Sequence, residues 1–262
     1  MPVDFKGKLV VAISSRALFD LDASHQVFEE EGLKAFELYQ RAKENEVLEP
    51  GFAYPLVQKF LKLNEGLPEE KSLVEVLLLS RNRADTGVRV FNSIQHHGLN
   101  ITRAAFTGGK SPYGYAKAFG VHLFLSTNPF DVEQALQAGC AAATIWSGPG
   151  INVSKDALNI AFDGDAVIFS DESEKIFKTK GLEAFNENEA KKREELLPDG
   201  PFKGFLQALH ALQQQELPIP LRTALVTSRS APAHARVVHT LRHWGIALNQ
   251  SNFLGGLEKV NF

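Results

Sequence analysis

Two carboxylates separated by one residue, Asp163 and Asp165, stand directly after the apolar run 157–162. The run predicts a strand, and the carboxyl ends of strands in open α/β sheets line the crevice where ligands bind. Two acids at this spacing can divide their roles, one attacking or binding a metal ion while the other transfers a proton. Phosphoryl transfer needs such a pair together with Mg²⁺, because charge on the phosphate oxygens has to be neutralised. A bare Asp-x-Asp is most often a solvated turn, so residues elsewhere in the chain decide between these interpretations.

Hydroxyl and ammonium groups later in the chain are suitable companions for the two acids. Thr227 ends the β-rich run 222–227 and is followed by Ser228. A hydroxyl there can donate to a phosphate oxygen beside the amides of a helix N-terminus, although an ordinary N-cap uses the same residue types. Lys259 can hold both a phosphate and the attacking carboxylate, whereas an isolated lysine is commonly only solvated. We therefore predict a phosphate-sized site formed by the two acids, the hydroxyls and the lysine.

The elements that must position these residues alternate along the chain. β-Rich apolar runs are separated by stretches with helical periodicity, which predicts an α/β protein with a mainly parallel, covered sheet. Clear helical patterns occupy residues 87–97 and 233–244. The predicted strands are 9–14, 74–80, 102–107, 121–126, 142–145, 158–163, 222–227 and 252–254.

The chain also repeats itself. A shift of 149 places Ser14 on Asp163 and runs without a gap for 50 residues, of which 14 are identical. About three identities are expected by chance at ordinary composition. A shift of 147 then places Ser80 on Thr227 and aligns two Gly-Gly pairs. Matched glycines in long gapless runs indicate a duplication, so we predict two tandem Rossmann-like parallel-sheet units.

The first copy lacks both acids, because Ser14-Ser15-Arg16 stands where the second copy has Asp163-Gly164-Asp165. It cannot perform the same aspartyl chemistry. We therefore expect a degenerate lobe over residues 1–150 and a catalytic lobe over residues 151–262, the latter with a small helical cap after its first strand. Cations of the first lobe that could reach the phosphate of a ligand, unless they cap helices or face solvent, are Arg16, Arg81 and Lys110.

The two copies also differ in length. The first copy continues past its Gly-Gly pair through a further strand and helix, whereas the second ends at Phe262 soon after its own pair. On this register we expect the catalytic lobe to be incomplete at its C-terminal end by roughly forty residues.

The order strand-Asp-x-Asp, strand-Thr, Lys resembles the first three signature motifs of the haloacid-dehalogenase superfamily. Four longer segments resemble the cytosolic 5′-nucleotidase I family, and the resemblance covers almost the whole chain. The segments are VAISSRALFD (11–20), GVRVFNSI (87–94), TGGKSP (107–112) and AFDGDAVIFSDESE (161–174).

The resemblance implies hydrolysis of nucleoside 5′-monophosphates to nucleoside and phosphate. It implies that Asp163 attacks phosphorus to form an aspartyl-phosphate, and that Asp165 protonates the departing 5′-oxygen and then activates water. It also implies that Mg²⁺ is held by Asp163 and the backbone carbonyl of Asp165, and the phosphate by Thr227 and Lys259. The fourth superfamily motif, an acidic pair after another strand, normally completes the magnesium shell. The sequence ends before its expected place, so we expect weaker magnesium binding.

Two other functions stay open at this point. The chain could be a catalytically silent nucleotide-binding or regulatory protein, which the missing fourth motif favours. It could instead be a phosphatase of the same superfamily that acts on another small phosphate ester.

Composition restricts the partners and the compartment. The chain has 28 basic and 31 acidic residues and a net charge of −3, which argues against a nucleic-acid surface but not against a small anion in a local positive pocket. Cys140 is the single cysteine, so an internal disulfide is excluded, as is typical of a reducing compartment. The N-terminus does not read as a signal peptide, and the apolar runs are too short to cross a bilayer. We expect a cytoplasmic protein without a membrane partner, and a homo-oligomer stays open.

Overall fold

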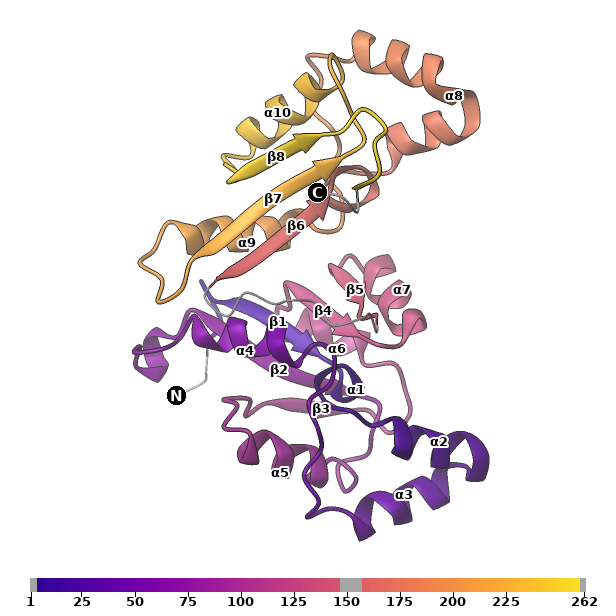
Figure 1. Ribbon diagram of the computed structural model, residues 1–262, viewed down its shortest axis with the longest axis vertical. Helices are drawn as coiled ribbons and strands as arrows, with labels where there is room; N and C mark the ends of the chain where they lie inside the picture. Colours follow the sequence, from indigo (N-terminus) through magenta and orange to yellow (C-terminus); the bar gives the residue numbers. More distant parts are fainter. Residues whose placement is uncertain (1–3, 147–156, 260–262) are drawn as a thin grey trace. The chain divides into compact units, whose positions relative to one another are not determined.

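The computed structural model describes residues 4–146 and 157–259. They belong to two compact units, Met1–Lys155 and Asp156–Phe262. Each unit contains one parallel sheet with helices packed against it (Figure 1). The predicted α/β class with two parallel-sheet units is therefore confirmed, and the arrangement is consistent with a Rossmann-like fold of the haloacid-dehalogenase type.

The first unit has a five-stranded parallel sheet in the order β3-β2-β1-β4-β5. Its central strand β1 is buried along its whole length. Val10 and Ala12 pack in one core cluster with residues of α6 and α7, and the alternate residues of the strand fill the opposite face. Burial on both faces explains why the strand is an unbroken apolar run. The elements of this unit are β1 (Leu9–Ile13), α1 (Ser15–Leu18), α2 (Asp22–Glu31), α3 (Leu33–Ala42), α4 (Tyr54–Lys62), η1 (Glu69–Lys71), β2 (Val74–Ser80), α5 (Val88–His96), β3 (Ala104–Phe106), α6 (Tyr113–Ala118), β4 (Leu123–Ser126), α7 (Pro129–Gln137) and β5 (Ala142–Thr144).

The second unit has a three-stranded parallel sheet in the order β6-β7-β8. In Figure 1 the long helix α8 projects beyond the sheet, whereas α9 and α10 run alongside the strands. The elements of this unit are β6 (Leu158–Asp163), the short helical turn η2 (Gly164–Ile168), α8 (Glu172–Lys191), α9 (Lys203–Gln213), β7 (Leu221–Thr227), α10 (His234–His243) and β8 (Gln250–Phe253).

Strand pairing follows the register that the repeat predicts. Leu9 pairs with Val74 between β1 and β2, and their repeat counterparts Leu158 and Leu221 pair between β6 and β7. The pairing of β2 with β3 likewise matches that of β7 with β8. The carboxyl end of β1 therefore corresponds to that of β6, and the end of β2 to that of β7.

Each unit carries a cap of two helical segments joined at a glycine. Gly32 lies between α2 and α3 with φ 83° and ψ −176°, and Gly181 bends α8 with φ 83° and ψ −178°. Glycine suits this left-handed conformation because it has no Cβ to clash with the backbone. The predicted helical cap of the second unit is thus present, and the first unit has its counterpart (Figure 1).

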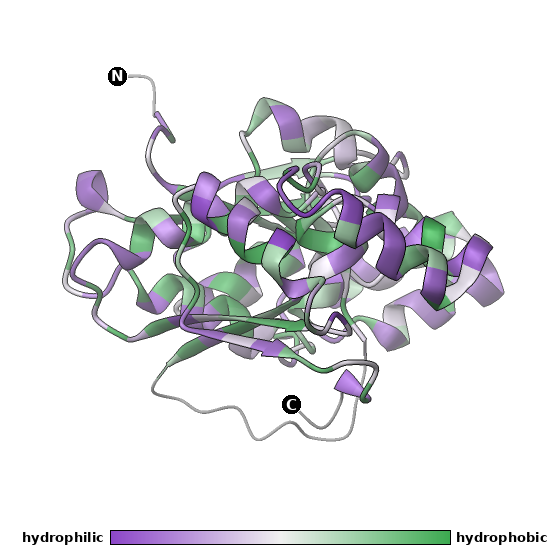
Figure 2. Ribbon diagram, turned by 90° about the horizontal axis from the view of Figure 1, so that it is seen from above, coloured by the Kyte–Doolittle hydropathy of each residue, from purple (hydrophilic) through white to green (hydrophobic). Residues whose placement is uncertain are grey.

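Helices such as α4 and α5 have hydrophobic and hydrophilic residues on different faces, and green and purple residues alternate along the helices in Figure 2. Such amphipathic helices bury one stripe against a sheet and leave the other in water. Among the residues that the structure describes, we find no helix that is both long and apolar enough to cross a bilayer.

Several predicted details differ from the structure. The first predicted strand ends at Ile13 rather than at residue 14, because Ser14 caps the next helix with its side chain. The strands predicted at 102–107 and 121–126 begin two residues later, at Ala104 and Leu123. Phe177, a large apolar residue, is 49% exposed on the cap and packs edge-on against Phe185.

Candidate active site

Asp163 ends β6 and presents its carboxylate beside Lys259. Oδ1 of Asp163 accepts from the backbone N–H of Gly164 at 2.7 Å. Oδ2 lies 2.5 Å from Nζ of Lys259, and both side chains are 39% exposed. Lys259 reaches the carboxylate after the chain turns at Gly255 and Gly256, whose φ values are 60° and 93°. The result is a carboxylate that is accessible to solvent and has a cation next to it.

Thr227 ends β7 and lies next to Gly164, the residue that follows Asp163. A Cβ on Gly164 would stand 3.1 Å from Oγ1 of Thr227, which is tighter than ordinary packing. The glycine between the two acids therefore allows the first and second strands to bring their ends close together. Thr227 is buried, and its Oγ1 accepts from the backbone N–H of Arg229 at 3.3 Å. Its neighbour Ser228 is exposed.

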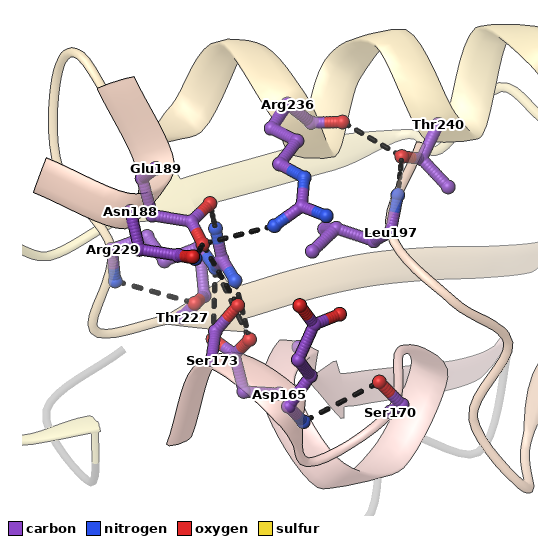
Figure 3. Close-up of polar contacts among 12 residues, drawn as sticks. Asp165, Ser170, Ser173, Asn188, Glu189, Leu197, Thr227, Arg229, Arg236 and Thr240 are labelled. Carbon is purple, nitrogen blue, oxygen red and sulfur yellow. Dashed lines mark hydrogen bonds and ion pairs between the residues drawn. The ribbon is translucent and has the colours of Figure 1, made fainter. Parts of the chain in front are cut away.

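Asp165 is held by a guanidinium. Nε of Arg229 donates to Oδ2 of Asp165 at 2.9 Å, and Nη2 donates to Oδ1 at 2.6 Å (Figure 3). This two-point geometry matches the fork of the guanidinium to the plane of the carboxylate. The next residue, Ala166, has φ 63°, a conformation that is uncommon outside glycine. The chain thus turns sharply after β6, and the carboxylate of Asp165 pairs with Arg229 instead of pointing into solvent.

Arg229 is held in turn by Glu189, which lies on the cap helix α8. Nη1 of Arg229 donates to Oε2 of Glu189 at 2.5 Å, and Nη1 of Arg236 donates to Oε1 at 3.1 Å (Figure 3). The Ser173 hydroxyl donates to the same Oε1 at 2.8 Å. The side chains of Glu189, Arg229 and Arg236 are only 1%, 1% and 2% exposed. Buried charges persist only when they are paired and hydrogen-bonded, and each of these is.

The charges of this network support one another. Burial by itself would raise the pKa of Glu189, but the charges of Arg229 and Arg236 and the hydrogen bonds from Arg229 and Ser173 lower it. Burial likewise opposes the charge of Arg229, but Asp165 and Glu189 outweigh it and raise the pKa of the guanidinium. Both groups are therefore ionised at neutral pH.

The same network fastens the cap to the sheet. Arg236, on α10, donates through Nε to the backbone oxygen of Glu195 at 3.0 Å. Thr240, one turn further on, accepts from the backbone N–H of Leu197 at 2.9 Å (Figure 3). The segment that follows α8 is thus tied to α10, and Glu189 ties α8 itself to Arg229. The position of Asp165 consequently depends on residues of the cap.

The cations predicted from the first copy have other partners. Arg16 forms an exposed ion pair with Asp22 at 2.9 Å. Arg81 donates twice to Asp131, at 2.8 and 2.7 Å, and once to the backbone of Gly109. Lys110 is exposed. The predicted residues of the second copy therefore come together, whereas these cations lie in the other unit and are placed only relative to its own sheet.

Sequence reasoning missed Arg229 and Glu189. A glutamate within a charged helical segment looks like a solvated residue, because burial there depends on how the cap folds back. One signal was available: the repeat aligns Glu189 with Gln40 and Arg236 with Arg89. Polar residues that recur at matched positions of two copies indicate a shared buried contact.

Few groups in the described ranges could bind a metal ion. No cluster of three or more histidine, cysteine, aspartate or glutamate side chains is found within residues 4–146 and 157–259. The half-exposed carboxylate of Asp163 offers hard oxygen donors, whereas both oxygens of Asp165 are engaged by Arg229.

The parallel sheet presents Asp-x-Asp after its first strand, threonine at the end of its second and lysine after its third, which is consistent with a protein of the haloacid-dehalogenase type. The chain belongs to the 5′-nucleotidase family, whose sequence profile matches residues 1–262. It is 40% identical over 266 residues to human cytosolic 5′-nucleotidase 1B. The match covers 97% of this chain but 44% of that protein, so the chain spans less than half the length of this relative. No solved structure gives a significant match.

Proposed function

We propose that this protein hydrolyses nucleoside 5′-monophosphates to a nucleoside and phosphate at the site formed by Asp163, Asp165, Thr227 and Lys259. Membership of the 5′-nucleotidase family and the name of the human relative support this substrate class. The geometric observation that carries the proposal is the contact of the exposed Asp163 carboxylate with Lys259 at 2.5 Å. A cation there can neutralise a phosphate that approaches the carboxylate.

The reaction that fits these groups has two halves. An oxygen of Asp163 attacks phosphorus, the bond from phosphorus to the 5′-oxygen breaks, and Asp165 gives a proton to that oxygen. Water then attacks the aspartyl-phosphate, Asp165 takes a proton from the water, and the phosphorus–Asp163 bond breaks. Thr227, Ser228 and Lys259 bind the phosphate oxygens. Inorganic phosphate and the free carboxylate of Asp163 result.

One oxygen of Asp165 has to leave Arg229 and take up a proton from solvent before Asp165 can act as an acid, because both its oxygens accept hydrogen bonds from the guanidinium. The other oxygen can stay on Arg229, so we assign Arg229 as a positioning residue that orients Asp165. Glu189 fixes Arg229 from the cap. Closure of the cap over a substrate would therefore move Arg229 and, through it, the carboxylate of Asp165.

Magnesium is the cofactor that we propose. Mg²⁺ retains several waters and is commonly bound by one or two carboxylates together with substrate phosphates. The carboxylate of Asp163 and the backbone carbonyl of Asp165 are donors of the right kind. A bound Mg²⁺ would neutralise charge on the phosphate in addition to Lys259.

The decisive experiment measures phosphate release from purified protein with nucleoside monophosphates and sugar phosphates, each with and without Mg²⁺. We expect AMP-type substrates to be hydrolysed and Asp163→Asn to abolish turnover, because an amide cannot form the acyl-phosphate. Asp165→Asn should lose roughly 10²–10⁴-fold. Asp20→Asn, in the exposed Asp-x-Asp of the first unit, is the matched control and should retain activity.

The same screen separates the two remaining candidates. Preference for a sugar phosphate would favour a phosphatase of different specificity, and nucleotide binding without turnover would favour a silent regulatory homologue. Full activity in Asp163→Asn would refute the mechanism. We further propose the division into a degenerate lobe at 1–150 and a catalytic lobe at 151–262, and a cytosolic location as in the name of the human relative.

A further inference from the structure

The first unit contains a cavity of about 460 Å³ at the carboxyl ends of β1, β2 and β4. Ser14, Ser80 and Asn82 line it on the side of the strands, and Phe28 and Phe36 line it on the side of the cap. Its size is typical of pockets for small organic ligands. Every lining residue belongs to the first unit, so this cavity is separate from the site at Asp163.

Comparison with the repeat explains why space is left in the first unit. The repeat aligns Asn82 of the first copy with Arg229 of the second, and Phe36 with Phe185. In the second unit the Arg229 guanidinium lies 5.4 Å from the centre of the Phe185 ring and covers it. The first unit has a short amide in place of that long side chain. The ring of Phe36 therefore borders an open cavity where Phe185 has a cation over it.

The strand ends supply buried donors that lack acceptors. Oγ of Ser15 and Oγ of Ser80 lie 3.0 Å apart, and Ser80 Oγ also accepts from the backbone of Asn82. Only one of the two hydroxyl protons can occupy the bond between them, so the other needs a further acceptor. Nδ2 of Asn82 is buried without a partner among the described residues. Unpaired buried donors are costly, and one oxyanion in the cavity could accept from all of them.

The charges around the cavity also favour an anion. Arg81 and Arg83 are already paired with Asp131 and Glu37, so they add little net charge. Arg16 has only an exposed partner on α2, and exposed ion pairs are weak. It can therefore turn toward a ligand. No carboxylate stands at the end of β1, where the second unit has Asp163.

The cap provides an aromatic wall opposite these donors. Phe28 is 45% exposed although it borders the cavity, and its ring packs edge-on against Phe36 with centroids 6.1 Å apart. His25 lies parallel to Phe28 with centroids 6.3 Å apart. Planar heteroaromatic rings stack well on such side chains. The carboxylate of Glu37, in the same wall, can accept from a hydroxyl or an exocyclic amine.

We propose that this cavity is a second ligand site, which binds a nucleoside phosphate with its phosphate at Ser15, Ser80, Asn82 and Arg16 and its base against Phe28 and Phe36. The first unit has no aspartate at the end of β1 that could form an acyl-phosphate, so we expect the ligand to be bound without being hydrolysed. The site would make the protein responsive to a nucleotide independently of turnover.

The test uses the full chain carrying Asp163→Asn, in EDTA, so that bound nucleotide is not consumed. AMP binding is followed by calorimetry, and its location by photolabelling with 8-azido-AMP and peptide mass spectrometry. We expect labelled peptides from α2 and α3. Asn82→Asp replaces the unpartnered donor with an acceptor of the same shape, so it should reduce this labelling and the associated affinity by about tenfold or more, the loss of one hydrogen bond to a charged group. Phe28→Ala should weaken AMP but not inorganic phosphate.

Phe177→Ala is the matched control for Phe28→Ala. The repeat places both phenylalanines at the same cap position, and they are 49% and 45% exposed, so each truncation should be tolerated. Phe177→Ala should leave labelling of α2 and α3 unchanged. Labelling confined to the second unit, or unchanged in both Asn82→Asp and Phe28→Ala, would refute the proposal. Equal affinity for adenosine and AMP would refute the phosphate contact, and equal affinity for phosphate and AMP would refute the base contact.

Discussion

Two acids that are two residues apart have different environments in the second unit. Asp163 is half-exposed beside one lysine, whereas both carboxylate oxygens of Asp165 accept hydrogen bonds from Arg229. A nucleophile must be reachable from solvent, and a proton carrier must be aimed at the leaving oxygen. The neighbours of the two carboxylates, more than their spacing, therefore support the division of roles.

Arg229→Lys tests the positioning role. Lysine keeps the positive charge but not the planar fork, so Asp165 should be oriented less well. We expect kcat for AMP to fall by about 10–100-fold with little change in KM, because a misplaced group costs rate more than ground-state binding. Steady-state kinetics with phosphate detection measure both constants. Arg242→Lys, at an exposed position of α10, is the control, and an unchanged kcat in Arg229→Lys would contradict the assignment.

Cys140 offers a prediction that is independent of catalysis. Burial raises the pKa of its thiol from 9.0 to about 11. The thiolate is the reactive form, so two pKa units make alkylation by iodoacetamide near pH 8 about 100-fold slower than for a free thiol. Because the chain has one cysteine, mass spectrometry reports this site alone. The rate should rise to that of a free thiol in urea, and fast reaction of the folded protein would show that the thiol is exposed.

At the scale of elements, the cap of the second unit is held by charge rather than by apolar packing alone. Glu189 brings a single carboxylate from α8 to two guanidiniums that arise from the segment after β7 and from α10. The first unit uses Gln40 in the same place, where its Oε1 accepts from Ser24 and Arg89. The same backbone arrangement is thus compatible with a neutral or an ionic connection.

Glu189→Gln should therefore destabilise the second unit. Removing one partner of a buried ionic network leaves uncompensated charge and costs about 3–5 kcal/mol. Arg229 and Arg236 would both lose their shared carboxylate. Urea unfolding followed by Trp244 fluorescence in a Trp146→Phe background reports on this unit, since the chain has two tryptophans. Glu187→Gln, at an exposed position of the same helix, should have little effect.

The effect of Glu189→Gln should also depend on pH. The neighbours of Glu189 lower its pKa below the ordinary 4.5, so its stabilising contribution is complete above that value. It is lost as the pH falls through the lower pKa of the folded state. The difference in unfolding free energy between wild type and variant should therefore shrink as the pH falls below 4.5. A constant difference over this range would contradict the ionic role.

Much of the fold follows from sequence, and the reasons are local. Strands such as β1 and β6 are continuous apolar runs, and paired glycines such as Gly32 and Gly181 mark the same bend in both caps. The order of the motifs along the chain, with a lysine after the third strand, also anticipated the contact between Asp163 and Lys259. By contrast, the burial of Glu189 and Arg229 arises only when the cap folds onto the sheet. Their side chains carry no local sign of that burial.

At the scale of the whole molecule, the two units share register, caps and several polar contacts but differ at the ends of their first strands. One retains the acids, whereas the other has serines and a cavity. We interpret this as a division between hydrolysis and binding after duplication. Introducing only the two acids into the first unit should not make that unit hydrolytic. The repeat places Pro112 where the second unit has Lys259, and Asn82 where it has Arg229.

The corresponding experiment grafts Ser14→Asp, Ser15→Gly and Arg16→Asp into the chain that carries Asp163→Asn. We expect no recovery of AMP-dependent phosphate release, because the new acids would lack both the lysine and the positioning arginine. The graft should also weaken 8-azido-AMP labelling of α2 and α3, since two carboxylates replace a hydroxyl and a guanidinium at the anion end of the cavity. Recovered turnover would mean that the acids suffice without their partners, and unchanged labelling would mean that the anion binds elsewhere.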